Sequence, residues 1–497
     1  MDSLLRNRLT ALGASSLAVA LGWWLANGIY DLPLLLFAIT GAASVVAVFG
    51  VPLDTAALGL LLFGYVVGNR GFAQFSVVPG LPALPAEIGL VLCTGWLMVK
   101  SAFGKQLPIK RDLLNIAVLL WIAIGSARII PDLRVHGFVA LRDFATIYYA
   151  AFFFIAQAQV VHEISRRFLE RCLLVAVVVV IPLAELFRRF PEFFLSKLTF
   201  GGIPLIYFKG DLVATFMVVG VLYSHRRWEA SRRVGWLLVA LGGFVGVLIT
   251  ENRSSLLGLF AATVWLVAGR RAALLRTLLF AVLIGGIGLV GALGIGAVSS
   301  RENFALSVYE RVLSIADFSG DRAYLSTDVE HKGGNNRFRL IWWQTIIGET
   351  IDGDPWLGLG FGHDLAASFV RRYYPDNDDE FSARSPHCIL ITLFGRTGVI
   401  GLLAFLGIVA AIIQRTWLAL RAPHIDENQV TAWLTPWIIL ISACLGVVLE
   451  GPMGAVVFWA TLGMAAGASH PTPTEEISLL VAQPGRIDML PSLRSTV

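Results

Sequence analysis

Long apolar runs separated by short polar segments cover most of this 497-residue sequence. We identify about fourteen runs, most of them near the roughly 20 residues that an α-helix needs to cross a hydrocarbon layer. They begin near residues 10, 32, 53, 84, 111, 138, 168, 203, 235, 254, 273, 387, 433 and 453. Some runs are short, so the expected fold is an all-α polytopic membrane protein of about 12–14 transmembrane helices.

The composition excludes an ordinary water-soluble domain. Hydrophobic residues make up 56% of the chain and charged residues 15%, with a mean hydropathy of +0.73, whereas about a quarter of the residues of a soluble domain are charged. The net charge of +5 does not indicate a nucleic-acid partner, because the basic residues are scattered through short loops. The four cysteines have no metal-ligand spacing. The expected partner is the lipid bilayer.

Basic residues gather in five consecutive alternate loops between the runs. The clusters are Lys100, Lys105, Lys110 and Arg111; Arg166, Arg167 and Arg171; Arg226, Arg227, Arg232 and Arg233; Arg270, Arg271 and Arg276; and Arg415 and Arg421. Cytoplasmic loops of membrane proteins are enriched in Lys and Arg. The alternation therefore predicts a cytoplasmic N-terminus.

This orientation divides the chain into four parts. Residues 1–298 form the N-terminal transmembrane helices, and residues 299–386 form one large extracytoplasmic, periplasmic loop with short helices, one of them from Asn336 to about Glu349. Residues 387–468 form the C-terminal transmembrane helices. Residues 469–497 contain four prolines and no Phe, Trp or Tyr. This composition predicts a weakly ordered cytoplasmic tail.

Several basic residues fall on the extracytoplasmic side, against the usual bias. They are Arg128, Arg134, Arg142, Arg188, Arg189, Lys197, Lys209, Arg253, Arg337, Arg339, Arg371, Arg372 and Arg384. Their retention suggests an anionic ligand on that face, although contacts with lipid headgroups or solvent are the alternative for each one. Arg253 lies in a tight turn between two apolar runs, where pairing with Glu251 is an equal alternative.

Arg337 and Arg339 open the helix predicted from Asn336. The free N–H groups of a helix N-terminus favour an anion, so these two guanidinium groups are candidate diphosphate ligands. A solvated first turn is the alternative. The acidic run Asp376–Glu380 lacks the glycine and spacing of a calcium loop, and a solvated turn is predicted there.

His387 follows Pro386 at the start of an apolar run. Proline in the first turn marks a helix start, which places the imidazole at the extracytoplasmic membrane boundary. A neutral ring there can accept a proton from a sugar hydroxyl. A surface or capping role is the alternative.

Three motifs together resemble those of the O-antigen ligase and polymerase superfamily of bacterial membrane glycosyltransferases. The run from His387, with Ile391, Gly398 and Gly401, is similar to its His-x-x-x-Leu, then Gly-x-x-Gly signature. The stretch from Arg339 to Trp343, followed by Asp354 to Gly360, is similar to its Arg, Trp, then Pro-x-x-Gly-x-Gly block, and Asn252 to Ser254 resembles its Ser-Arg-Gly turn. The resemblance covers roughly residues 200 to 470. Cys388 replaces a usual Asn or Ser, and Arg396 stands where Glu is common.

The resemblance implies attack by an acceptor hydroxyl on a glycan linked to undecaprenyl diphosphate. His387 would be the general base, and Arg253 and Arg339, with Arg337, would hold the diphosphate in place of a metal, so that no cofactor is required. Glu450 would position the acceptor, with pairing to an arginine as the alternative. The acceptor would be a glycan, a lipid A-core or a protein.

Two other functions are compatible with a chain of this kind. A secondary transporter of a small anion or sugar also has polar residues and broken helices within the membrane, but the halves show no inverted repeat and the arginines lie on one face. A structural subunit of an envelope complex would not need His387.

Overall fold

The computed structural model describes residues 50–75, 84–104, 109–250, 252–272, 327–373, 384–422 and 427–468, with isolated positions at 19, 22–24, 46, 48, 275, 276, 279 and 283. Of residues 104, 327–335 and 427 it describes the backbone alone. The predicted runs from residues 10 and 32, most of the run from 273, and the tail from 469 lie outside these ranges.

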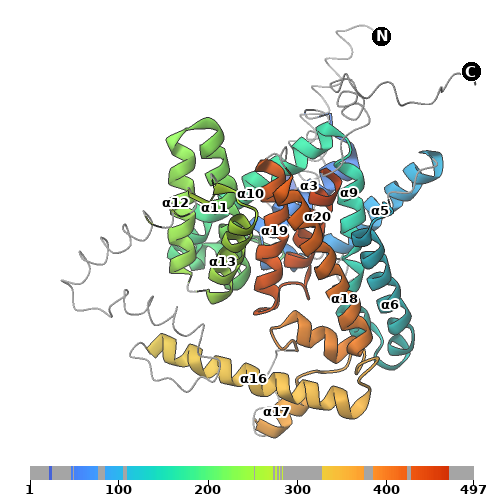
Figure 1. The fold of residues 1–497 in the computed structure, drawn as a ribbon. Coiled ribbons are helices and arrows are strands. Elements are labelled where there is room, and N and C mark those ends of the chain that lie inside the picture. The colour runs from blue at the N-terminus through green and yellow to red at the C-terminus, as the bar shows by residue number, and fades with distance from the viewer. Residues whose placement is uncertain are drawn as a thin grey trace, which may run out of the picture.

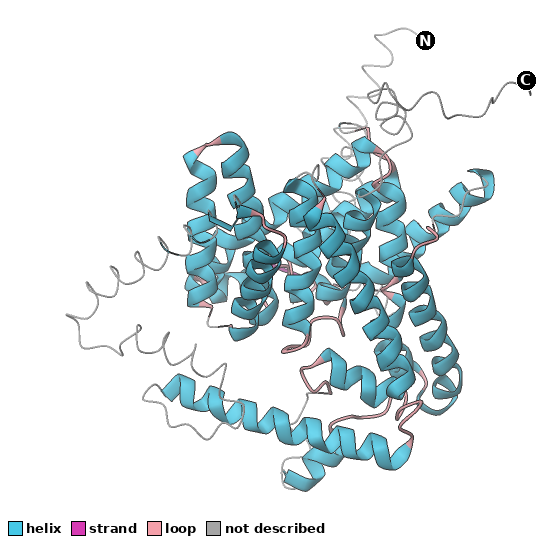
Figure 2. Ribbon diagram, viewed as in Figure 1, coloured by secondary structure: helices cyan, strands magenta, loops and turns pink. Residues whose placement is uncertain are grey.

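The described chain is almost entirely helical, which confirms the predicted fold class (Figure 2). Its first half contains α3 (Leu53–Val67), α4 (Arg70–Ala73), α5 (Pro85–Gly104), α6 (Leu113–His136), α7 (Phe138–Asp143), α8 (Ala145–Tyr148), α9 (Ala151–Gln159), α10 (Glu163–Arg189), a π-helix (Phe193–Lys197), α11 (Gly210–Ser231), α12 (Val234–Ile249) and α13 (Arg253–Ala268). Its second half contains α16 (Thr327–Gly353), α17 (Ala367–Tyr373), α18 (Ile389–Arg421), α19 (Glu427–Ala443) and α20 (Pro452–Ala468).

Four segments of the described chain are long and apolar enough to cross a membrane: Pro85–Phe103, Leu113–His136, Phe138–Gln159 and Ile389–Arg421. Four further apolar helices are shorter, at Leu53–Val67, Val234–Ile249, Arg253–Ala268 and Pro452–Ala468. The run expected from residue 203 begins its helix only at Gly210. The preceding residues instead form a small antiparallel hairpin of β1 (Thr199–Phe200) and β2 (Ile203–Pro204), with Gly201 and Gly202 in the turn at positive φ.

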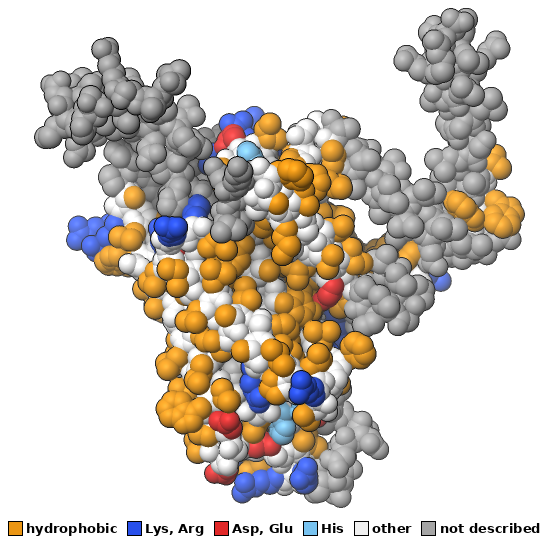
Figure 3. All heavy atoms as spheres, turned by 90° about the vertical axis from the view of Figure 1, so that its right-hand side faces the viewer, with side chains coloured by type: hydrophobic (Ala, Val, Ile, Leu, Met, Phe, Trp, Pro, Cys, Tyr) orange, Lys and Arg blue, Asp and Glu red, His pale blue; other side chains and the backbone are white. Residues whose placement is uncertain are grey.

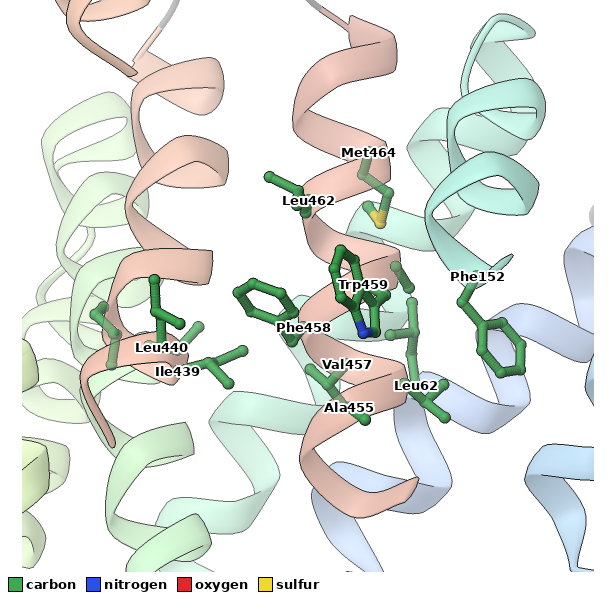
Figure 4. Packing of buried hydrophobic residues seen from close by; sticks show 14 of the residues in the cluster. Leu62, Phe152, Ile439, Leu440, Ala455, Val457, Phe458, Trp459, Leu462 and Met464 are labelled. Atoms are coloured by element: carbon green, nitrogen blue, oxygen red, sulfur yellow. The ribbon is translucent and has the colours of Figure 1, made fainter. Parts of the chain in front are cut away.

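The core of the bundle is a continuous apolar cluster in which α20 lies centrally. Trp459 and Phe458 of α20 are at most 1% exposed and pack among Leu62, Phe152 and Ile439 of three other helices (Figure 4). On the face that Figure 3 shows, large apolar side chains cover the middle, while charged residues gather toward the two ends. This distribution fits a bundle whose middle lies in lipid.

The loops predicted on the cytoplasmic side meet at one end of the bundle. Arg415 at the end of α18 lies 3.0 Å from Asp112 before α6, and the Lys110 Nζ donates to the Ala466 carbonyl of α20. Arg271 after α13 donates to the Leu420 carbonyl at 2.9 Å. We call this the basic end.

The opposite end carries α16, which lies across the bundle, with α17 beneath it (Figure 1). Phe338, Ile341, Trp342 and Ile346 of α16 pack in an apolar cluster with Phe369 of α17. The His387 loop leads from this layer into α18. We call this the His387 end.

Candidate functional site

His387 lies in a strained turn before α18 and not in the helix itself. The helix begins at Ile389 with Cys388 as its N-cap, so the prediction that Pro386 occupies the first helical turn is wrong. His387 has a φ of +59°, an unusual value for a residue with a Cβ. The Trp343 Nε1 donates to the Pro386 carbonyl at 2.7 Å, and the Trp342 ring meets the His387 ring at 6.1 Å between centroids. Helix α16 therefore holds the turn.

The two arginines of α16 lie in the middle of the helix. The helix begins at Thr327, so the prediction that Arg337 and Arg339 sit at its N-terminus is wrong. Gly333 and Gly334 lower helix propensity by about 1 kcal/mol each, but they do not end this helix. Arg339 is partly buried and donates to the Leu445 carbonyl at 2.8 Å, whereas Arg337, two residues earlier, points elsewhere and is exposed.

Arg253 is the arginine that opens a helix. Asn252 caps α13 by accepting from the Ser255 N–H at 3.1 Å, and Arg253 is the first helical residue. The Ser254 hydroxyl lies 3.0 Å from the Ser442 hydroxyl, which ties this turn to the end of α19. The alternative partner Glu251 lies outside the described residues.

Positive charge converges on His387 from several elements. Burial and then the charges of Arg339 and Lys209 lower the pKa of His387 to about 4, against an opposing effect of Asp211. Burial, followed by the charge of Arg253, also lowers the pKa of Arg339. The imidazole is therefore neutral at pH 7 and can accept a proton, beside guanidinium groups suited to a diphosphate.

Lys209 and Asp211 belong to this cluster, although the sequence did not connect them with His387. The Lys209 Nζ lies 3.4 Å from Asp211 and donates to the Val447 carbonyl in the loop between α19 and α20. A Cβ at Gly446 in the same loop would lie 2.6 Å from the Asp211 carboxylate. The available signal was position: both residues border an apolar run on the predicted outer side, as His387 and Arg253 do.

Glu450 lies behind the His387 turn. Its carboxylate accepts from the Thr392 hydroxyl at 2.8 Å and from Ser385, whose hydroxyl also accepts from the His387 N–H at 3.3 Å. Burial raises the pKa of Glu450. Within the described residues no arginine forms an ion pair with it, so the predicted alternative of a direct arginine partner is not observed.

The glycines of the two signature-like blocks pack against one another. Gly358 and Gly398 have φ values of +72° and +61°, and a Cβ at Gly398 would lie 2.3 Å from the Trp356 carbonyl oxygen. The Leu359 N–H donates to the Gly395 carbonyl at 2.7 Å. Gly398 interrupts α18, and the loop after α16 fills this bend. These glycines shape the junction between α18 and the loop after α16.

Several outward arginines have carboxylate partners. Arg396 lies 2.7 Å from Asp143 in a buried pair, and Asp143 also accepts from the Gly362 N–H at 3.0 Å. Arg128, Arg142 and Arg188 pair with Asp132, Asp143 and Glu185. The misplaced positive charge is thus partly structural, and the cluster around His387 is a distinct part of it.

Residues 238–406 match the family model described as O-Antigen ligase. This region belongs to the O-antigen ligase family. The O-antigen ligase region runs from α12 into α18 and includes Arg253, Arg337, Arg339 and His387, while Lys209, Asp211 and Glu450 lie outside it. A search of curated proteins gives no match to this chain.

Proposed function

We propose that this protein is a membrane glycosyltransferase that moves a glycan from undecaprenyl diphosphate to an acceptor hydroxyl. The observation that carries the proposal is the neutral His387 near Arg339 and Lys209, with Arg253 near Arg339, within or next to the O-antigen ligase region. The C–O bond between the anomeric carbon and the diphosphate breaks as the acceptor oxygen bonds to that carbon. The acceptor proton passes to His387.

Arg339 and Arg253 bind the diphosphate in this proposal. Guanidinium groups stay charged when partly desolvated and donate two parallel hydrogen bonds to phosphate oxygens. They stabilise the leaving diphosphate, a task that a metal performs in other transferases, so we propose a metal-independent reaction. Arg337 is exposed and lies outside this cluster. Its role as a diphosphate ligand therefore remains a prediction from the sequence.

Donor binding also activates His387. The diphosphate offsets the positive field of Arg339 and Lys209, which together with burial lowers the pKa of the imidazole. The pKa of His387 then rises toward the range in which a general base works well at neutral pH. The base gains strength only when the donor is in place.

The acceptor approaches from the side of Glu450. Glu450 is linked through Ser385 to the His387 turn, and we propose that it positions the acceptor hydroxyl. The acceptor is a glycan, a lipid A-core or a protein, and the reaction serves cell-surface polysaccharide or lipopolysaccharide synthesis. The His387 end faces the periplasm of the inner membrane. The charge cluster at this end, away from the middle of the bundle, does not favour the transporter alternative.

The test is glycan transfer by the purified protein with a lipid-linked donor. His387→Ala and Arg339→Ala should each lower the rate at least about 100-fold, as loss of a general base or of leaving-group stabilisation does. His162→Ala, at an exposed histidine beside α10 at the basic end, is the matched control and should keep the rate. Glycan transfer at the wild-type rate in both site variants would contradict the proposed mechanism.

A further inference from the structure

A polar cavity lies at the basic end of the bundle, far along the helices from His387. Its volume is about 440 Å³. It is formed by the start of α10, the end of α11, the start of α19 and the end of α20. All of its lining residues lie outside the O-antigen ligase region, so the family match does not account for it.

Three arginines line this cavity. Arg226 is only 8% exposed, and its guanidinium lies 5.7 Å from the Tyr223 ring centroid. Arg166 and Arg167 both pair with Glu163, each through one nitrogen. A guanidinium carries five N–H donors, so these two arginines keep donors available for a ligand.

The balance of charge favours an anion. The lining contains three arginines against two carboxylates, those of Glu163 and Glu170, and it adds the amide side chains of Asn428 and Gln429. Arginine forks and amide N–H groups together match the oxygens of a phosphate group. The net positive charge of the lining equals in magnitude the negative charge of one phosphodiester.

The other walls of the cavity are apolar. Leu173, Ala432 and Met464 line it beside the charged residues, and the helix ends that form it belong at the level of lipid headgroups. A phospholipid combines a phosphate with an apolar glycerol and acyl region. We propose that this cavity binds the phosphate of an anionic phospholipid from the leaflet at the basic end.

The experiment measures the melting temperature of the purified, delipidated full chain with added phosphatidylglycerol, phosphatidylcholine or inorganic phosphate. Phosphatidylglycerol should raise it by about 2–4 °C, because a ligand of the native state stabilises that state. The double substitution Arg166→Gln with Arg167→Gln should remove most of this rise. Both side chains are at least one third exposed, so the variant should fold.

The matched control is Arg232→Gln with Arg233→Gln, two exposed arginines at the same end that do not line the cavity. This variant should keep the full rise. A rise equal to that of the wild type in the Arg166 and Arg167 variant, or an equal rise with phosphatidylcholine, would overturn the proposal. An equal rise with inorganic phosphate would overturn the proposal that the bound phosphate belongs to a lipid, and would show that the cavity binds free phosphate.

Discussion

At the scale of single residues, the charge of His387 depends on neighbours that are distant in sequence. Arg339 comes from α16 and Lys209 from the turn before α11, and together with burial they keep the imidazole neutral. The positive φ of His387 costs of order 1–3 kcal/mol, and the bond from Trp343 to Pro386 helps to hold it. The turn is thus maintained by its surroundings.

The lowered pKa of His387 predicts a pH dependence of stability. The unfolded imidazole has a pKa near 6.5, and the folded one about 4. Above pH 6.5 both states are neutral and the full stability is present; as the pH falls toward 4 the unfolded state takes up the proton first, and stability is lost. In His387→Gln, the loss of unfolding free energy between neutral and acidic pH should be smaller than in the wild type by about 1–3 kcal/mol.

The measurement is thermal unfolding of the wild type and of His387→Gln at pH 7 and pH 5. The difference between the two proteins isolates His387 from the carboxylates, which titrate in both. Parallel declines in the two proteins would contradict the lowered pKa.

At the scale of elements, the bend of α18 depends on Gly398. Gly398→Ala should destabilise the protein by about 3 kcal/mol or more, since a Cβ would meet the Trp356 carbonyl at 2.3 Å and φ is +61°. Gly407→Ala in the same helix meets nothing within 4 Å and should be neutral or slightly stabilising. Thermal unfolding of both variants checks this, and equal effects would argue against the packed bend.

The buried pair of Arg396 and Asp143 joins α18 to α7 and to the Gly362 loop. Asp143→Asn should cost about 3–5 kcal/mol, because it leaves a buried guanidinium without its charge partner. Adding Arg396→Gln should recover part of that loss. A double-mutant cycle on unfolding free energies measures the coupling, and simple additivity of the two losses would show that the pair is not coupled.

At the scale of the whole molecule, the two ends of the bundle should face different compartments. In a variant without the native cysteines, Arg372→Cys at the His387 end should react with an impermeant maleimide in intact spheroplasts. Ser231→Cys at the basic end should react only after permeabilisation. Both positions are exposed, so access to the reagent should depend on the membrane, and the reverse pattern would invert the proposed orientation.

The residues of the proposed site could be singled out from the sequence where a polar or charged residue borders an apolar run. His387, Arg253 and Arg339 were singled out from the sequence, and the structure brings their charges together. Lys209 and Asp211 were not connected with His387, because that proximity arises only when α11 packs beside α19 and its following loop. The helix termini were harder still: α16 starts well before Asn336, and α18 starts after His387.

The sequence by itself determined the membrane class, the helical architecture and the grouping of basic loops, because hydrophobic length and charge are local properties of the chain. Only the tertiary structure decided which charges meet. Gly358 fits against Gly398, Arg396 pairs with Asp143, and Lys209 approaches His387 through contacts between residues that are distant along the chain. Such contacts follow from packing, which no local pattern records.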